Sequence, residues 1–227
     1  MDYVPIISDI DIHYGVHDKK KLFTSDNPRE TSLKVSLEYE KRFQKENPNF
    51  IHIPRTQVMC IDLLQDAVNF VHPLVDSIKM LFGEFPSYDH VASENIKEID
   101  INNLAELKPY LDMLPESWID KVGMDYWSSL RRLTWKVSPT PVRILSQLLP
   151  NPLNIWTWNR SKIKQELENQ NLNNIANMYE SYYMNGWKLF ESNITSTEYF
   201  QNCLLTGSKV LELSYDWYIQ NITNNRK

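Results

Sequence analysis

Glycine is scarce in this chain of 227 residues. Only five glycines occur, and the two that lie nearest each other, Gly186 and Gly207, are 21 positions apart. A phosphate-binding loop of the Walker type or of the dinucleotide-binding type needs several glycines within a few residues, because backbone amides must approach the phosphate closely. The sequence therefore excludes P-loop ATPases and GTPases and NAD(P)-dependent dehydrogenases.

Cysteine is scarcer still, and targeting signals are not found. The two cysteines, Cys60 and Cys203, are far apart and have apolar neighbours, which predicts buried thiols and not a disulfide framework or a zinc site. The first eleven residues carry three aspartates and no basic stretch followed by an apolar run, so no signal peptide is expected. With no apolar run of membrane-spanning length, we expect a cytoplasmic protein with no membrane partner.

Positive charge is not in excess. The chain carries 24 Lys and Arg against 29 Asp and Glu, a net charge of −5. A negative net charge argues against a nucleic-acid partner, because affinity for the phosphate backbone comes from clustered cations.

Composition changes near residue 90. All five histidines lie at or before this position and all seven tryptophans lie after it. The first part mixes strand and helix patterns, whereas the second shows apolar residues at helical spacing separated by proline and asparagine clusters. We therefore predict an α+β protein in which a small mixed-sheet domain, residues 1–90, is followed by an all-helical bundle, residues 91–227.

The expected elements follow from these patterns. Residues 5–16 alternate between apolar and polar side chains, which predicts a strand with one polar face. Pro28 and Glu30 indicate the start of a helix that ends near residue 47. Further along, we expect extended segments at 50–53 and 57–63, a short helix at 73–85, and helices at 116–136, 140–149, 160–169, 171–190 and 195–221. The aromatic residues Trp118, Tyr126, Trp127 and Trp135 are expected to pack in the core or between domains.

The sharpest chemical signal is the acidic pair Asp9 and Asp11, preceded by Ser8. Side chains at positions i and i+2 of a strand point to the same face, so the two carboxylates repel each other unless a cation lies between them. Carboxylate pairs bind Mg²⁺, and such ions can hold a triphosphate during displacement at phosphorus. The alternative is an exposed strand face that happens to carry two acids.

The segment from Ser8 to His13 resembles the metal-binding strand of the nucleotidyltransferase superfamily, which includes DNA polymerase β and the aminoglycoside adenylyltransferases. Later segments are similar in order to those of streptomycin-type adenylyltransferases, namely residues 54–61, Asp66, 72–73 and 81–85. The resemblance implies that Asp9 and Asp11 are the catalytic, Mg²⁺-binding residues and that Ser8 lies beside the phosphates of a bound NTP, most simply ATP. It also implies transfer of a nucleoside monophosphate to a hydroxyl of a small molecule or protein.

The sequence departs from this family at two points. The family has a Gly-Ser pair about ten residues before the first aspartate, whereas only eight residues precede Asp9 here and none is glycine. Either the natural chain begins upstream of Met1 or this contact to the triphosphate is missing. The third family carboxylate aligns with Gln57, a neutral amide that cannot act as a general base. Asp62 is the nearest acid, but a regular strand would turn it to the opposite face from Gln57.

Three other groups are weaker candidates. His13 and His17 are too far apart on a strand to share one metal ion. The lysines at 19–21 could steer a triphosphate, although a solvated turn is the simpler interpretation. Arg131 and Arg132 could present a surface for stacking of nucleic-acid bases, although a helix face flanking the core is favoured.

Two hypotheses follow for function. The first is a Mg²⁺-dependent nucleotidyltransferase, and the second is a degenerate relative that binds nucleotide or a partner protein without turnover. The sequence leaves open which NTP and acceptor are used, and whether the protein is an enzyme.

Overall fold

The computed structural model describes residues 1–2, 4, 12–16, 18, 26–49, 53, 56–60, 79–84 and 93–223. The chain divides into two compact units. One comprises residues 1–7, 71–81 and 90–227, and the other comprises residues 8–70 and 82–89. The predicted domain boundary near residue 90 stays a prediction, because much of the first ninety residues lies outside the described ranges.

The smaller unit contains a strand, a helix and a second strand. Strand β1 (Ile12–Val16) pairs with β2 (Thr56–Cys60) in parallel, and helix α1 (Pro28–Glu46) lies between them in the chain. Parallel strands need a long connection, and a helix within it supplies the required length.

Helix α1 begins and ends close to the positions predicted from the sequence. The side chain of Asn27 accepts a hydrogen bond from the Glu30 backbone N–H and donates one to the Glu30 carboxylate, so the two residues form a reciprocal cap. Pro28 occupies the first turn, where its missing N–H costs nothing. None of the α1 residues is buried, and Leu33 is 74% exposed.

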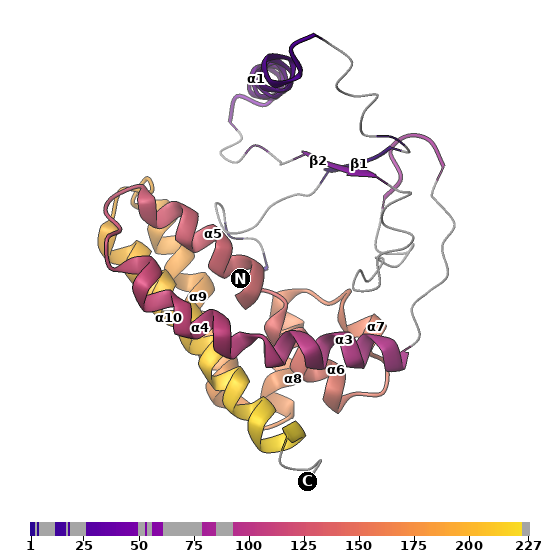
Figure 1. The fold of residues 1–227 in the computed structure, drawn as a ribbon, viewed down its shortest axis with the longest axis vertical. Coiled ribbons are helices and arrows are strands. Elements are labelled where there is room, and N and C mark those ends of the chain that lie inside the picture. Colours follow the sequence, from indigo (N-terminus) through magenta and orange to yellow (C-terminus); the bar gives the residue numbers. More distant parts are fainter. Residues whose placement is uncertain are drawn as a thin grey trace. The chain divides into compact units, whose positions relative to one another are not determined.

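The larger unit is helical over nearly all of its described length (Figure 1). Its helices are α3 (Ser93–Ala105), α4 (Leu107–Trp118), α5 (Asp125–Val137), α6 (Thr140–Leu148), α7 (Pro152–Ile155), α8 (Arg160–Asn169), α9 (Asn173–Glu191), α10 (Thr197–Tyr218) and a final π-helical turn η3 (Ile219–Thr223).

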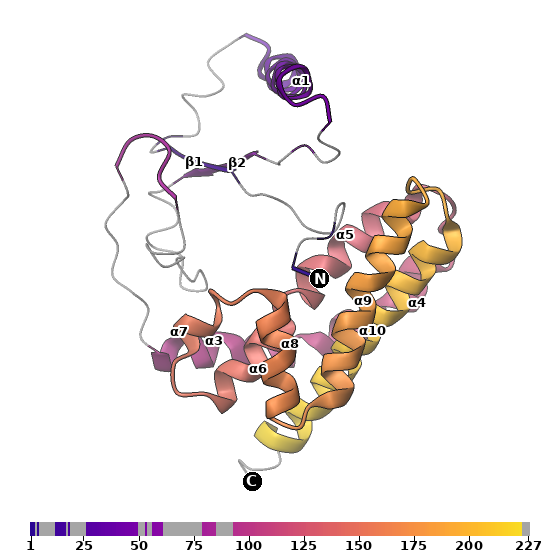
Figure 2. The same ribbon diagram turned by 180° about the vertical axis from the view of Figure 1, so that it is seen from behind.

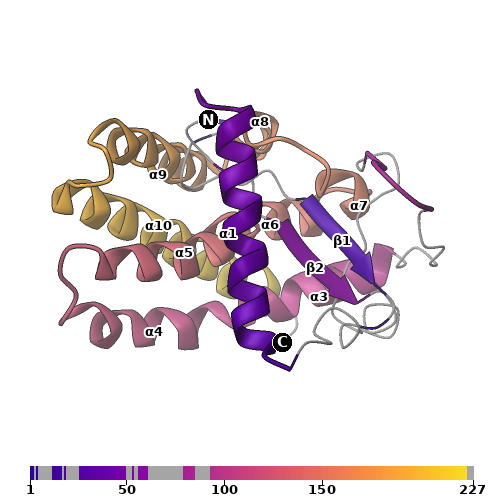
Figure 3. The same ribbon diagram turned by 90° about the horizontal axis from the view of Figure 1, so that it is seen from above.

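Helix α10 is the centre of this unit. It contacts α9, α5, α4, α3 and α6, and Figure 3 shows α9, α10, α5 and α4 side by side. Figure 2, seen from behind, shows α8 and α9 on the face opposite to α4. The core is therefore built around α10, whose buried side chains include Phe200, Leu204, Leu211 and Trp217.

Three tyrosines of α9 form hydrogen bonds with α5 and with Ser138, the residue that follows α5. Tyr179, Tyr182 and Tyr183 are fully buried. The Tyr182 hydroxyl lies 2.7 Å from the Thr134 hydroxyl, while Tyr179 and Tyr183 donate to the backbone carbonyl and the hydroxyl of Ser138. Because each phenol has a hydrogen-bond partner, the buried tyrosines add apolar area without leaving a polar group unsatisfied.

The predicted fold class, α+β with a small mixed sheet, is wrong. The described residues are mostly helical, and their only paired strands are β1 and β2, which run parallel. Of the strand expected at residues 5–16, only residues 12–16 lie within the described ranges, and they form β1. A mixed sheet also needs an antiparallel neighbour, and the described ranges contain none.

Two helix predictions are wrong as well. Residues 79–84 of the expected helix 73–85 are not helical, and Gly83 has a φ of +79°. Leu81 and Phe82 are 74% and 96% exposed, so no apolar face is buried there to stabilise a helix. The single helix expected at 116–136 is interrupted in the structure. Helix α4 ends at Trp118, and α5 begins at Asp125, two residues after Gly123, whose φ is +51°.

Candidate functional site

The predicted site residues Ser8, Asp9 and Asp11 lie outside the described residues. What the structure describes is the strand that follows them, because β1 begins at Ile12, directly after Asp11 in the sequence. Their assignment to Mg²⁺ and to a nucleotide therefore stays a prediction.

The backbone register brings Gln57 beside this strand. In the parallel pair, Gln57 lies opposite His13, which is two residues after Asp11 in the sequence. Gln57 thus lies on the strand that pairs with β1, while its expected position beside the acidic pair stays a prediction, because Asp9 and Asp11 lie outside the described residues. The position carries an amide and no carboxylate, so the described strands contribute no third acid. Asp62 lies outside the described residues.

A Mg²⁺ site would depend on Asp9 and Asp11 for its anionic ligands. Within the described ranges, no group of three His, Cys, Asp or Glu residues is arranged to hold a metal ion. The two carboxylates suit Mg²⁺ by their chemistry, since it prefers oxygen ligands and keeps several waters. His17 lies outside the described residues, so the structure does not bear on His13 and His17 as a pair.

The aromatic stripe is only partly buried. Tyr126 is buried and stacks on Phe200, with ring centroids 6.2 Å apart, whereas Trp135 is 61% exposed. Trp135 therefore does not pack in the core, and the alternative expectation, packing between domains, stays a prediction. The guanidinium of Arg131 lies 5.8 Å from the centroid of the Trp127 ring on the same helix, a cation–π contact that covers part of this helix face.

A buried acid, Asp100, lies between α3, α6 and α7. Its side chain is fully buried, it accepts a hydrogen bond of 3.3 Å from the indole N–H of Trp156, and its Oδ1 lies 3.8 Å from Nε of Arg143. Burial raises the pKa of Asp100, while hydrogen bonds from Ser146 and Trp156 and the charge of Arg143 act in the opposite direction. The contact with Arg143 is an ion pair without a hydrogen bond, because both atoms lack a hydrogen-bond partner in the described structure.

This ion pair holds three helices together. Arg143 also lies 5.9 Å from the Trp156 ring centroid, so one guanidinium contacts both the acid and the aromatic ring. Asp100 is fully buried and the Arg143 side chain is only 14% exposed, and both are occupied by contacts between helices, which favours a structural role.

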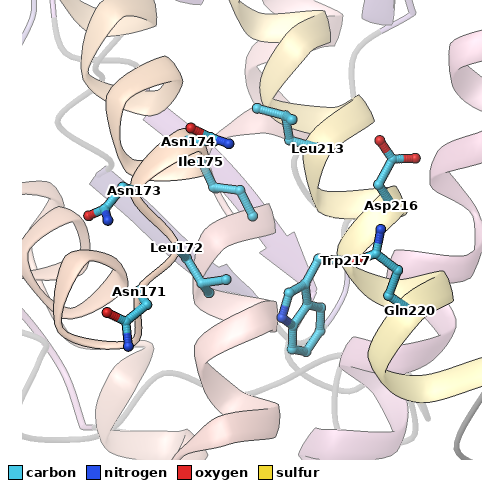
Figure 4. Close-up of a pocket in the computed structure, with 9 residues that line it drawn as sticks. All are labelled: Asn171, Leu172, Asn173, Asn174, Ile175, Leu213, Asp216, Trp217 and Gln220. Atoms are coloured by element: carbon cyan, nitrogen blue, oxygen red, sulfur yellow. The ribbon is translucent and has the colours of Figure 1, made fainter.

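A hollow of about 380 Å³ lies between the start of α9 and the end of α10. Figure 4 shows residues 171–175 on one side, the last turns of α10 on the other, and the indole of Trp217 between them. From the sequence, the asparagines at 169–174 were interpreted only as helix breakers. Their clustering was a signal of a polar surface, but the sequence did not show that α10 lies opposite.

A second hollow of about 340 Å³ is mainly apolar and lies between α4, α5 and α10. Ile119 and Leu205 line it and are 89% and 61% exposed. Gln201 supplies the polar contact by donating to the Tyr126 hydroxyl at 3.2 Å. The hollow is therefore a surface suited to apolar groups.

No protein-family model, characterised protein or solved structure matches this chain significantly. The resemblance to nucleotidyltransferases thus depends on the residues quoted above. No helix in the described part of the chain has the length and apolar character needed to cross a membrane.

Proposed function

We propose that the protein is a Mg²⁺-dependent nucleotidyltransferase that uses Asp9 and Asp11 to bind a metal–NTP complex. The observation that carries the proposal is the pairing of β1 with β2, which brings a second strand alongside the one that directly follows the acidic pair. In this superfamily's chemistry, an acceptor hydroxyl oxygen forms a bond to the α-phosphorus, and the bond to the pyrophosphate leaving group breaks. A base takes the hydroxyl proton.

Each group of the chain has a defined part in this proposal. Asp9 and Asp11 would hold the Mg²⁺ ion, and Ser8 would donate a hydrogen bond to a phosphate oxygen of the bound NTP. Bound Mg²⁺ would offset the negative charge that develops on the leaving pyrophosphate. The acceptor is a hydroxyl of a small molecule or a protein, because a net charge of −5 does not favour a nucleic acid.

One structural observation favours a second candidate, nucleotide binding without turnover. Gln57 lies on β2 opposite His13, and the resemblance to the family aligns it with the third carboxylate. An amide neither accepts the acceptor's proton nor offsets metal charge, so the chain would bind Mg²⁺–NTP but transfer slowly or not at all.

Pyrophosphate release tests the enzyme hypothesis. The protein is incubated with Mg²⁺, each of the four labelled NTPs and a mixed pool of small-molecule and protein hydroxyl acceptors. The enzyme releases pyrophosphate in step with a labelled product, and Asp9→Asn combined with Asp11→Asn abolishes both. Asp26→Asn, an exposed acid outside the proposed site, is the matched control and retains full activity.

The variant Gln57→Glu separates the two candidates. If the natural protein binds Mg²⁺–NTP without releasing pyrophosphate, the binding hypothesis holds, and a carboxylate at this position should then create or raise turnover. If neither protein binds any Mg²⁺–NTP, both hypotheses are wrong.

A further inference from the structure

Exposed apolar side chains surround the second hollow, which lies between α4, α5 and α10. The turn from α4 to α5 carries Ile119, Val122 and Met124, and the last two are 71% and 64% exposed. Leu205 of α10 lines the same hollow as Ile119. Figure 3 shows this turn and the start of α10 at the same end of the helical unit. A turn in water is normally built from polar residues, so exposed apolar side chains gathered around one hollow indicate a surface for a partner.

The bottom of the hollow belongs to the packed core. Leu204 and Tyr126 line it and are buried, and the Tyr126 ring stacks on Phe200. The Tyr126 hydroxyl already accepts a hydrogen bond from Gln201. The other lining residues are Pro115, Trp118, Ile119 and Leu205. Apolar side chains of a partner would therefore enter a preformed apolar hollow and gain free energy by leaving water.

The charge beside this hollow is negative. Glu116, Asp125 and Glu198 are exposed, and each lies within one helical turn of a lining residue. None of these three carboxylates makes an ion pair in the described part of the chain. Lys121 and Lys209 lie equally near, but each is paired with a neighbouring acid. Three uncompensated carboxylates beside an apolar surface attract a partner whose apolar groups are flanked by Lys or Arg.

The hollow also restricts the conformation of the partner. Because its walls are the helices α4, α5 and α10, they offer no strand edge to an extended peptide. The lining has too few polar groups to bind a peptide backbone, so the partner must satisfy its own N–H and C=O groups. A helix does this, and apolar residues at positions i, i+3, i+4 and i+7 present several side chains to one surface.

We propose that this hollow is the docking site for a basic amphipathic helix of another protein. Apolar side chains from one face of that helix enter the hollow between Ile119 and Leu205. Its Lys and Arg residues lie opposite Glu116, Asp125 and Glu198. The volume of about 340 Å³ is within the range of pockets that bind compact groups, about 300–1,000 Å³.

The same charges disfavour two other occupants. A symmetric contact between two copies of this chain would bring the three carboxylates of one copy close to those of the other, and like charges repel. A membrane surface that contains anionic lipids would also be repelled by these carboxylates. A basic helix is the occupant that gains from both the apolar hollow and the charge beside it.

Fluorescence anisotropy with designed peptides and the full chain tests the proposal. The probe is a labelled helical peptide of about 18 residues, or about five turns, with leucines along one face and lysines on both flanks. We expect it to bind at least about tenfold more tightly than a peptide with glutamate in place of every lysine. A peptide of the same composition with its leucines spread around the helix should not bind.

Three results with these peptides would overturn the proposal. The first is that the leucine–lysine peptide does not bind. The second is equal binding of the lysine and glutamate peptides, which would show that the carboxylates are not involved. The third is equal binding of the peptide with spread leucines, which would show a charge attraction without docking of an apolar face.

Ile119→Ser and Leu205→Ser locate the binding. Both side chains are mostly exposed, so their loss should leave the helical unit folded, with an unchanged circular dichroism spectrum and melting temperature. We expect each variant to weaken binding of the leucine–lysine peptide about tenfold, because a buried apolar contact is lost. Leu148→Ser is the matched control, since Leu148 is an exposed leucine of α6 outside the hollow. Wild-type affinity in both hollow variants would overturn the proposal.

Glu116→Gln combined with Glu198→Gln tests the charges separately. We expect about fivefold weaker binding of the leucine–lysine peptide and a smaller difference between the lysine and glutamate peptides. Glu94→Gln, which removes an exposed acid of α3, is the control and retains wild-type affinity. An unchanged preference for the lysine peptide in the double variant would overturn the assignment of these carboxylates.

Two further measurements examine the other occupants. Sedimentation that shows a wild-type dimer and a Leu205→Ser monomer would assign the hollow to a second copy and overturn the proposal. So would flotation with phosphatidylcholine vesicles that the wild type shows and Leu205→Ser loses, since this would assign the hollow to lipid. Asp9→Asn combined with Asp11→Asn should bind the peptide as the wild type does, so this proposal and the nucleotide proposal fail separately.

Discussion

The carboxylate of Asp2 accepts hydrogen bonds from both the backbone N–H and the hydroxyl of Ser161, at 2.7 and 2.9 Å. Ser161 lies in the first turn of α8, where the backbone N–H groups and the helix dipole favour a negative charge. Arg160 donates to the backbone carbonyls of Met1 and Asp2, and Val4 is fully buried in the helical core. Hydrogen bonds therefore hold Met1 and Asp2 at the start of α8.

Replacement of Asp2 by Asn should destabilise the helical unit in a pH-dependent manner. Although burial alone acts to raise it, the two hydrogen bonds from Ser161 and the charge of Arg160 hold the pKa of Asp2 below its usual value. A lowered pKa contributes stability above the unfolded pKa, about 4, and this contribution is lost as the pH falls through the folded pKa. Urea unfolding should show a larger difference between wild type and Asp2→Asn at pH 7 than at pH 3. An equal difference at both pH values would show that the carboxylate charge is not involved.

Gly207→Ala should destabilise the packing of α10 against α5 and α9. A Cβ at this position would lie 2.7 Å from Cδ2 of Leu133 and 3.1 Å from the ring of Tyr182, both of which are fully buried. Alanine improves helix propensity by about 1 kcal/mol, whereas overpacking costs about 1–3 kcal/mol. We expect a net loss of about 1 kcal/mol in the free energy of unfolding.

Chemical denaturation measures this loss, and Leu133→Val provides the control. Valine lacks the Cδ2 atom, so the loss caused by Gly207→Ala should be smaller in a Leu133→Val background than in the wild type. The same loss in both backgrounds would show that the close approach to Leu133 is not its cause.

Asp100→Asn should change how stability depends on pH. Because burial raises the pKa of Asp100, the folded state binds a proton more tightly than the unfolded state does. Wild-type stability should then fall as the pH rises from about 4, the usual Asp value, through the raised pKa of the folded protein. Asparagine does not titrate, so the free energy of unfolding of the variant should rise relative to wild type over this window. Parallel profiles for the two proteins would contradict the raised pKa.

Cys203 should resist thiol reagents in the folded protein. Burial raises the pKa of its thiol to about 12, and the thiolate is the reactive form. In a Cys60→Ser background, labelling by iodoacetamide at pH 8 should follow the rate of unfolding and become rapid in urea. Fast labelling without urea would show that the thiol is accessible in the folded state.

The sequence predicted the helices whose apolar spacing and end signals agree. Pro28 and Glu30 gave the start of α1, and the predicted ranges 140–149, 160–169, 171–190 and 195–221 overlap α6, α8, α9 and α10 closely. Helix α3 was missed because a charged residue interrupts its apolar stripe. Ile96, Asp100 and Leu104 are all fully buried at helical spacing, but an aspartate in the stripe hides the pattern.

Sites that depend on tertiary contacts could not be predicted from the sequence. The hollow between α9 and α10 joins Asn171, at the end of α8, to Asp216 and Trp217, more than forty positions later in the chain. Only the packing of α9 against α10 brings these residues together. The acidic pair Asp9 and Asp11, in contrast, is predicted from local spacing alone, because side chains two apart on a strand share a face, and it stays a prediction.

Isothermal titration of the full chain with ATP in the presence of Mg²⁺ tests the central claim, that Asp9 and Asp11 bind a metal–nucleotide complex. We predict binding by wild type and by Asp26→Asn, which disappears when Mg²⁺ is removed with EDTA. We also predict no binding by Asp9→Asn combined with Asp11→Asn, with an unchanged circular dichroism spectrum and melting temperature. Equal affinity of the double variant and the wild type, or no binding of any of the four NTPs by the wild type, would contradict the account.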